Sequence, residues 1–428
     1  SSKMSLRSIS ACSLCHRFLV VKLRGMSTAA KLQPHTDFLK GEPHRKHPGV
    51  TNLKTLRLPE KLQVAARSII HRAQIKGLDV KAQNLVDFLW SRKRKVEDGA
   101  LRQKALNLER ELWNVDEQLL EERIQKKVLS ELRRTTYHWK QLKFDEELGV
   151  IYMAARLAGG YAAVRRALNE IKKRDESFCP ESLLDFGSGL GTVAWASHSC
   201  WPDSLKEMVC VDSSGPMNTL AERFSCQVWF CLTSVQFDLV VSAFTLSELP
   251  RAVDREDAVF TLWRKTNRYL VLVENGTKEG HQILMEARDT LLNKQEKTVH
   301  DFRPASTFAP CPHEMMCPKL NTDPVLPCNF QQRYHTLSLP GVRPHRDHVD
   351  SGLDSGLDWA RLIAPVLPRT RHVHCRMCCS DGQLQHVVVT PRKHGRDVYR
   401  CARSSDWGDQ VPVVQIRDGD EQSGSEEP

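Results

Sequence analysis

The sequence predicts an α/β fold with a doubly wound parallel sheet, and two short stretches carry this prediction. In the first, an apolar run that begins at Ser182 ends in Asp185. Glycines follow it at alternate positions, Gly187, Gly189 and Gly191. This is the order of a strand, a tight turn and a helix N-terminus at the first crossover of such a sheet. The second stretch, Glu207–Asp212, is another strand-like run that ends in an acid.

The glycine turn and the second acid together predict a site for an adenosine ligand. Glycine lets the backbone approach a ligand closely, and a helix start offers free N–H groups. Asp212 comes 21 residues after Gly191 and can bind both ribose hydroxyls. The spacing D-x-G-x-G-x-G suits S-adenosylmethionine better than a dinucleotide, whose fingerprint needs glycine where this chain has Thr192. The alternative is a tight turn that binds nothing.

The remaining elements of this sheet follow from apolar runs and helical periodicity. Further strands are expected at Phe237–Ser242 and Tyr269–Val273, with a weaker candidate at Val228–Leu232. We expect helices at Gly191–Ser197, Pro216–Arg223, Asp254–Thr266 and Gly280–Asn293. Only 25 residues separate Asp212 from Asp238, fewer than two crossovers and a strand normally need. The third-strand region is therefore predicted to be shortened.

The segment after the fourth strand, Asp238–Leu249, carries no recognisable catalytic motif. Methyltransferases that act on amines or bases often place Asn/Asp-Pro-Pro-aromatic or a Pro-Cys nucleophile here. This chain has neither, and Glu248 is interpreted as a helix or turn acid. We therefore predict no catalytic residue, because a fold that can bind a cofactor does not by itself supply an activity.

Charge is distributed unevenly along the chain. Residues 1–180 hold 36 Lys/Arg against 20 Asp/Glu, whereas residues 181–428 hold 26 against 32. The region from Leu58 to about Arg174 is helical in pattern and contains several basic clusters with aromatic neighbours. Basic groups neutralise phosphates and aromatic rings stack on unpaired bases, so an RNA-facing surface is predicted. The alternative is a solvated helical surface whose aromatic residues belong to the core.

Two further features concern compartment and membranes. The first 36 residues contain six Lys/Arg, several serines and no acid before Asp37, which is typical of a mitochondrial transit peptide. No apolar run approaches the ~20 residues of a membrane helix, so no membrane partner is expected.

Half of the fourteen cysteines lie in residues 311–401, several of them beside proline. Without a secretory signal this favours metal ligation over a disulfide framework. Four thiolates could bind zinc or an iron–sulfur cluster. The five-residue gap between Cys311 and Cys317 is unlike the knuckle of a zinc ribbon and slightly favours a cluster. His313 and His335 are weaker candidate ligands, and a set of buried, unliganded thiols is the alternative.

Together these landmarks resemble one family, the mitochondrial small-ribosomal-subunit assembly methyltransferase-like proteins. The motifs that carry the resemblance lie between about residues 50 and 410: Tyr152–Arg156 with Tyr161, Leu184–Gly189, Val241–Pro250, Val273–Thr277 with Gly280, Phe308–His313, Arg371–Cys375 and Trp407–Asp409. Two segments depart from the family pattern: residues 225–235, at the third strand, and residues 336–358, where a Pro/Arg/Asp-rich sequence replaces a strand.

The resemblance implies a class I methyltransferase-like sheet with two ligands. S-adenosylmethionine would lie near Asp185, Gly187, Gly189 and Asp212, and we add Gly191 from the turn itself. A [4Fe-4S] cluster would be bound by Cys311, Cys317, Cys328 and Cys378, leaving Cys375, Cys379 and Cys401 as bystanders. The family also implies binding to small-subunit rRNA and ribosomal proteins as a monomer on the assembling subunit, with little or no methyl transfer.

We therefore expect five regions. They are a transit peptide (1–36), a basic helical RNA-facing domain (37–176), an S-adenosylmethionine-binding domain (177–300), an iron–sulfur and basic C-terminal region (301–416), and a disordered acidic tail (417–428). The function expected is assembly of the mitochondrial small ribosomal subunit in the matrix. The alternative is an active S-adenosylmethionine-dependent rRNA methyltransferase.

Overall fold

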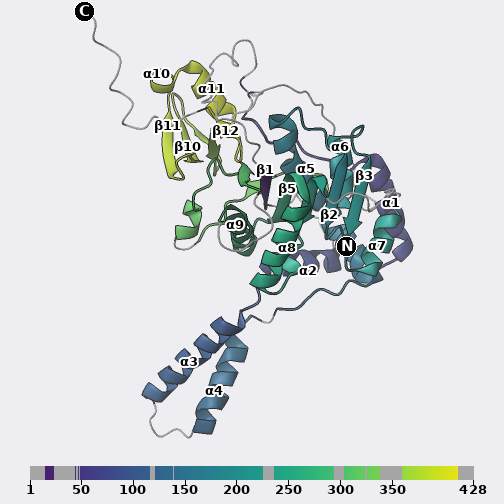
Figure 1. Cartoon of the computed structure of the whole chain (residues 1–428), viewed down its shortest axis with the longest axis vertical. Helices are drawn as coiled ribbons and strands as arrows, with labels where there is room; N and C mark the ends of the chain where they lie inside the picture. Colours follow the sequence, from purple (N-terminus) through teal and green to yellow (C-terminus); the bar gives the residue numbers. More distant parts are fainter. Residues whose placement is uncertain are drawn as a thin grey trace, which may run out of the picture.

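The computed structural model describes residues 15–23, 44, 47, 49–115, 121–137, 139–224, 236–293, 303–322, 325–337 and 359–412. It contains a large central sheet, a smaller C-terminal sheet and a helical hairpin that projects from the body (Figure 1). No helix within these ranges is both long and apolar enough to cross a membrane.

The central sheet has the strand order β3-β2-β4-β5-β1-β6, and β7 pairs with β1. Strands β3, β2, β4 and β5 are parallel, and β1 runs antiparallel to both β5 and β6. The strands are β1 Cys15–Leu23, β2 Ser182–Phe186, β3 Glu207–Val211, β4 Phe237–Ala243, β5 Thr266–Asn275, β6 Ala305–Ala309 and β7 Phe330–Gln331. The predicted α/β class with a parallel sheet is confirmed.

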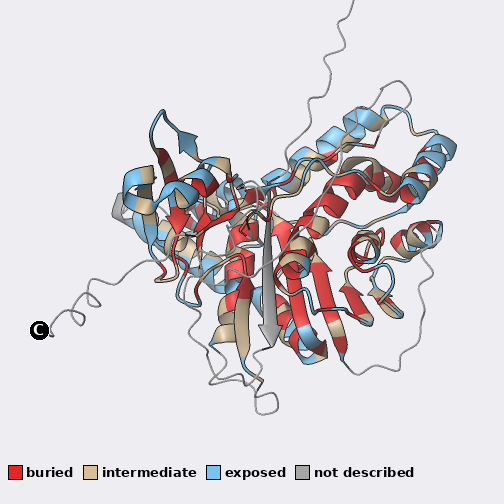
Figure 2. Ribbon diagram, turned by 90° about the horizontal axis from the view of Figure 1, so that it is seen from above, coloured by how far each residue is buried: buried red, intermediate tan, exposed pale blue. Residues whose placement is uncertain are grey.

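Helices cover both faces of this sheet, as a doubly wound fold requires. One apolar core joins the sheet to α1 (Glu60–Ala73), α5 (Glu146–Arg174), α6 (Thr192–Cys200) and α7 (Gly215–Glu222). On the other face, a second core contains α8 (Ala252–Lys265) and α9 (Lys278–Leu292). Figure 2 shows the buried strands between helices whose outer faces are exposed.

The strands alternate between these two cores because the side chains of a strand point to opposite faces. Leu183, Leu239 and Val271 lie in the first core, whereas Leu184, Val240 and Leu270 lie in the second. The predicted elements of this domain are observed with boundaries that differ by a few residues. The weak strand candidate Val228–Leu232 lies outside the described residues.

The helical region expected between Leu58 and Arg174 is observed as five helices, which also include α2 (Leu78–Ser91), α3 (Asp98–Val115) and α4 (Glu121–Thr135). Helices α3 and α4 pack on each other and stand away from the body (Figure 1). By contrast, α5 is largely buried against the sheet. Tyr161, one of the aromatic residues of this basic helical region, is 4 % exposed in this core.

The C-terminal sheet has the order β11-β10-β8-β12, with β9 paired to β10. Its strands are β8 Ala360–Leu362, β9 Leu367–Pro368, β10 Val373–Cys378, β11 Leu384–Val389 and β12 Gln410–Val411. Helices α10 (Pro391–His394) and α11 (Arg396–Ser404) accompany it. The acidic tail predicted to be disordered, residues 417–428, falls outside the described residues.

Strand β1 lies inside the segment predicted as a transit peptide. It fills the position between β5 and β6 and pairs through its backbone with both. Loss of residues 1–36 would leave the facing edges of β5 and β6 without this partner. The transit peptide stays a prediction. If it is removed, the sheet has to remain folded without β1.

Candidate functional site

The predicted glycine turn follows β2 directly. Gly187, Gly189 and Gly191 have φ values of +74°, +50° and +69°, a region that favours glycine. At Gly187 the need for glycine is also steric, because a Cβ would lie 2.1 Å from Oγ1 of Thr245. The turn therefore brings bare backbone to the carboxyl edge of the sheet, where ligands bind in open α/β folds.

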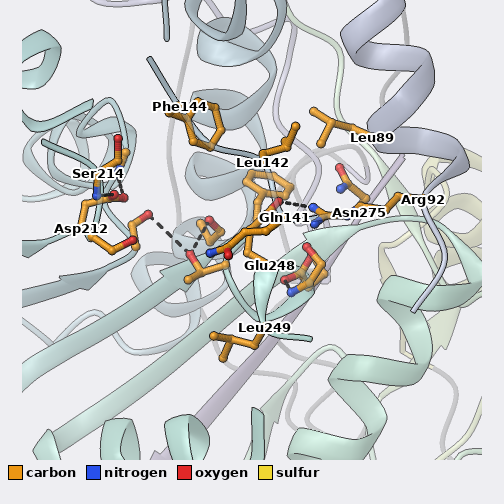
Figure 3. A pocket seen from close by; sticks show the side chains of 18 of the residues that line it. Leu89, Arg92, Gln141, Leu142, Phe144, Asp212, Ser214, Glu248, Leu249 and Asn275 are labelled. Carbon is orange, nitrogen blue, oxygen red and sulfur yellow. Dashed lines mark hydrogen bonds and ion pairs between the residues drawn. The ribbon is translucent and has the colours of Figure 1, made fainter. Parts of the chain in front are cut away.

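Asp212, at the end of β3, holds this turn in place. Its Oδ2 accepts a hydrogen bond from the Gly189 N–H at 2.8 Å, and its Oδ1 accepts one from the Ser214 N–H at 2.8 Å. Figure 3 shows Asp212 and Ser214 together at one end of a pocket. Each carboxylate oxygen has a further lone pair, so Asp212 can shape the turn and still accept hydrogen bonds from a ribose.

The pocket at this edge has a volume of about 710 Å³, which suits a small-molecule ligand. Gly187, Gly189 and Asp212 line it, whereas Asp185 and Gly191 are not among the lining residues. Asp185 is fully buried, and neither of its carboxylate oxygens has a hydrogen-bond partner among the described residues. Burial, with Asp212 nearby, raises the pKa of Asp185 well above its usual value.

Residues of the helical region close the other end of the pocket. Arg92, just after α2, forms an ion pair with Glu248 and lies 5.0 Å from the ring centroid of Trp139. Gln141 and Leu142 line the middle of the pocket, and Phe144 lies toward its Asp212 end (Figure 3). Glu248 belongs to the short 3₁₀ helix Leu246–Glu248, so its interpretation as a helix acid is confirmed.

Glu274, at the end of β5, is a pocket residue that sequence reasoning did not select. It is 1 % exposed, and burial raises its pKa to about 7. Its Oε1 accepts a hydrogen bond from the Ser247 N–H at 3.0 Å, and its Oε2 has no partner among the described residues. The available signal was an acid at the carboxyl end of an apolar strand, the same signal that identified Asp185 and Asp212.

The segment after β4 continues as Phe244 and Thr245, and Thr245 fills the space beside Gly187. Thr245 Oγ1 lies 3.2 Å from the carbonyl oxygen of Phe186, to which it can donate a hydrogen bond. The arrangement can hold a nucleoside-like ligand through backbone N–H groups and Asp212.

The four cysteines expected to bind a cluster line one small cavity. Cys311, Cys317, Cys328 and Cys378 come from four points in the chain and meet beside His313 and Arg361. Cys317 and Cys378 are buried, and Cys311 and Cys328 are half-buried. Nε2 of His313 lies 3.3 Å from the Cys378 sulfur, whereas His335 is not among the lining residues.

The other cysteines of this region have different surroundings. Cys375 and Cys379 belong to the apolar core of the C-terminal sheet, and Cys401 is also buried. Burial raises the pKa of Cys375 to about 12. Across the described ranges, no group of three or more His, Cys, Asp or Glu side chains is arranged to hold a metal ion. The thiols at the cavity are therefore grouped, but they do not form a preformed single-ion site.

Two buried arginines attach the cysteine cavity to the central domain. Arg288, on α9, donates from Nη2 to the backbone oxygens of His313 (3.1 Å) and Met315 (2.6 Å), which fixes the loop between Cys311 and Cys317. Arg361, on β8, lines the cavity and donates to both carboxylate oxygens of Glu170 on α5, at 2.7 and 3.1 Å. The cavity thus lies where the C-terminal sheet meets the central domain.

The parallel sheet covered by helices on both faces, with a glycine turn at its carboxyl edge, makes this chain a doubly wound α/β protein. The family model for the mitochondrial small ribosomal subunit protein Rsm22 matches residues 146–412, and this chain belongs to that family. A human relative, the ribosome assembly protein METTL17, mitochondrial, is 46 % identical over 401 residues, covering 88 % of this chain and 87 % of the relative.

More distant similarities are also found. The fission yeast Rsm22-cox11 tandem protein 2, mitochondrial, is 26 % identical over an alignment of 315 residues, and the match covers 59 % of this chain and 41 % of that protein. Among solved structures, the S-adenosylmethionine-bound aminopentose methyltransferase CalS10 from Micromonospora echinaspora has a TM-score of 0.22 at 20 % identity, covering 30 % of this chain and 55 % of its own. The plantazolicin methyltransferase BpumL has a TM-score of 0.20 at 11 % identity, covering 46 % and 80 %. TM-scores this low support no conclusion about this chain.

Proposed function

We propose that this protein is an assembly factor of the mitochondrial small ribosomal subunit that works in the matrix as a monomer. The observation that carries the proposal is the 46 % identity, over most of both chains, to a human protein named for mitochondrial ribosome assembly. The match to the small-subunit family over residues 146–412 supports the same role. Its partners would be small-subunit rRNA and ribosomal proteins of the assembling subunit.

The excess of basic residues in the first 180 positions supports the RNA part of this proposal. Helices α3 and α4 stand away from the body, and α4 carries the exposed Arg123, Lys126 and Lys127 in its first half. Basic side chains on a projecting element can reach phosphates without opening the domain. The affinity for rRNA should therefore fall steeply with salt.

We further propose that the pocket holds S-adenosylmethionine and transfers its methyl group little or not at all. The glycine turn, the Asp212 carboxylate and the pocket volume support cofactor binding. Asp185, directly before the turn, is kept among the proposed cofactor residues on the family motif, although it does not line the pocket in this structure. The bound cofactor would supply an activated methyl group, and Phe244 and Thr245 provide no group to receive or activate an acceptor.

The cysteine cavity is proposed to hold a [4Fe-4S] cluster on Cys311, Cys317, Cys328 and Cys378. Four thiols around one cavity are the donor set that such clusters use, with each cysteine binding a different iron. A single zinc ion on the same four thiols is the alternative occupant. The binding energy of the cluster would stabilise the junction between the C-terminal sheet and the central domain.

One observation favours the alternative, an active rRNA methyltransferase. Glu274 lies in the pocket with a pKa raised to about 7 and one carboxylate oxygen without a partner in the described part of the chain. A carboxylate of that kind can act as a general base near neutral pH. Methylated small-subunit rRNA that appears with the wild-type chain and disappears with Glu274→Gln would establish this alternative.

The test of the assembly role uses cells from which the resident relative has been removed. Full-length wild-type chain is expressed there, mitochondrial extracts are separated by sedimentation, and RNA cross-linked to the chain is sequenced. The proposal predicts that the chain co-sediments with small-subunit precursors and cross-links to small-subunit rRNA. A chain that sediments only as a free monomer and cross-links to no small-subunit rRNA would contradict it.

A further inference from the structure

Phe244 has an unusual backbone conformation at the point where β4 ends. Its φ is +62°, which is a genuine outlier for a bulky side chain. Its N–H donates to the carbonyl oxygen of Val273 at 2.7 Å, so the pairing of β4 with β5 holds the conformation in place. Strain of this kind concentrates at ligand sites, where it orients a side chain. The residue lines the pocket described above.

Arg156 of α5 is packed against the ring of Phe244. Its guanidinium carbon lies 4.8 Å from the ring centroid, within the range of a cation–π contact. One guanidinium nitrogen, Nη2, donates a hydrogen bond of 2.8 Å to Oδ1 of Asn275. Arg156 is only 3 % exposed, and it also hydrogen-bonds the Tyr152 side chain on the same helix. None of the ion pairs found among the described residues includes Arg156. Burying an arginine without an ion pair is costly, so these contacts need a functional explanation.

Arg92 provides a contrast within the same pocket. It also lies over an aromatic ring, that of Trp139, but it forms an ion pair with Glu248. Arg92 therefore has the ordinary partner of a buried cation. Arg156 instead meets an aromatic face and an amide oxygen, which are the contacts that proteins offer to planar ligands bearing N–H donors.

We propose that Phe244 and Asn275 form a second subsite of the pocket, for a planar amino or guanidinium group, and that Arg156 occupies this subsite within the same chain. Phe244 supplies the stacking surface and Asn275 accepts from the N–H edge. This rests on the proposed function, and it explains how a cofactor pocket is kept closed to an acceptor.

The subsite can be tested by removing the Arg156 side chain and adding methylguanidinium, which carries the same guanidinium group, as a free ligand. Methylguanidinium should bind to Arg156→Ala with a dissociation constant on the order of millimolar. The binding is measured by ligand-observed NMR at constant ionic strength. The wild-type chain should show no such binding. Arg251→Ala, the same change at an exposed position, is the matched control and should behave like wild type.

A double variant identifies the contacts. Adding Asn275→Leu to Arg156→Ala removes the accepting oxygen and should weaken methylguanidinium binding at least tenfold. Equal binding to wild type and Arg156→Ala, or no binding to a folded Arg156→Ala, would overturn the proposal.

If Arg156→Ala does not fold, Phe244→Leu provides a second measurement. It removes the aromatic surface, so Arg156 should become more reactive toward phenylglyoxal, as measured by mass spectrometry of the modified peptide. Unchanged protection of Arg156 in a folded Phe244→Leu would count against the subsite.

S-adenosylmethionine binding, measured in parallel by calorimetry, separates this inference from the proposed function. Methylguanidinium binding to Arg156→Ala without any cofactor binding would support the subsite and refute the proposed cofactor. Cofactor binding by both chains without methylguanidinium binding would support the cofactor and refute the subsite.

Discussion

Replacing Glu170 by Gln tests how the C-terminal sheet is held to the central domain. Glu170 is fully buried on α5 and is the shared partner of three buried arginines, Arg166, Arg174 and Arg361. Arg361 contributes two hydrogen bonds from β8, at 2.7 and 3.1 Å. The neutral amide would leave three guanidinium groups without their common counter-charge. Removing one partner from a buried ion pair costs about 3–5 kcal/mol, and we expect a loss of that size.

The assay is urea unfolding at pH 7, combined with limited proteolysis of the C-terminal sheet. The midpoint for Glu170→Gln should fall, and the C-terminal sheet should be cleaved first, because Arg361 is its link to α5. Glu181→Gln is the matched control, since Glu181 pairs with Lys206 at 2.8 Å on the surface. That control should be close to wild type. A Glu170→Gln chain as stable and as protease-resistant as wild type would refute the reasoning.

The effect should also depend on pH with a defined sign. Burial acts to raise the pKa of Glu170, but the neighbouring Arg361 and Arg166 guanidinium groups outweigh it and hold that pKa well below its usual value. A carboxyl group whose pKa is lower in the folded state stabilises the fold above its unfolded pKa of about 4.3. This stabilisation is lost as the pH falls toward the folded value. The difference between wild type and Glu170→Gln should therefore shrink in acid.

Three further changes give independent tests. Gly187→Ala places a Cβ 2.1 Å from Thr245 Oγ1 at a φ of +74°, so it should destabilise the chain by about 1–3 kcal/mol and abolish cofactor binding in calorimetry. Gly99→Ala is the control, because open space surrounds Gly99, and it should change neither property. Equal behaviour of the two variants would contradict the prediction. The folded wild-type chain should lose stability as the pH rises from about 4.5 to about 7, because folding raises the pKa of Glu274 and the folded state is more stable with that carboxyl protonated. Glu274→Gln should remove this decline. An identical dependence of stability on pH in both chains would show that the carboxyl is not buried as described. A chain that starts at residue 37 lacks β1 and should be cleaved faster near β6 than the full chain, whereas equal resistance would favour a removable leader.

The sequence predicted those parts of the fold that are marked by local signals. Strands β2 and β3 are short apolar runs ending near acids, and the glycine turn follows directly, so neighbouring residues suffice to identify them. Strand β1 has no such signal. Cys15–Leu23 contains Arg17 and Lys22 and has the composition of a transit peptide, and its partners in β5 lie some 250 residues later.

For the candidate site, too, the sequence predicted the residues that a local pattern marks and missed those that only the folded chain brings together. Asp212, Gly187 and Gly189 were found because their spacing is local, and they do line the pocket. Arg156 appears in the sequence as one basic residue among many, and only folding brings it to Asn275, 119 residues away. Glu170 reads as an ordinary helical acid beside Arg166, whereas its stronger partner, Arg361, follows 191 residues later.

The cysteine ligands depended on the resemblance to a known family, because spacing alone did not separate them from their neighbours. Cys375 and Cys378 lie on the same strand, yet Cys378 lines the cavity and Cys375 is packed in the apolar core of the C-terminal sheet. That difference follows from the alternation of side chains along β10, which places Val373, Cys375 and Met377 in the core and Cys378 on the opposite face.

The most direct measurement is an anaerobic ultraviolet–visible spectrum of the purified full chain, with iron, sulfide and zinc assayed on the same sample. A [4Fe-4S] cluster predicts broad absorbance near ~400 nm and about four irons per chain. Cys378→Ser should lose both, and Cys375→Ser, the matched control on the same strand, should keep them if it folds. Zinc alone, no metal, or equal iron content in wild type and Cys378→Ser would contradict the proposed cluster.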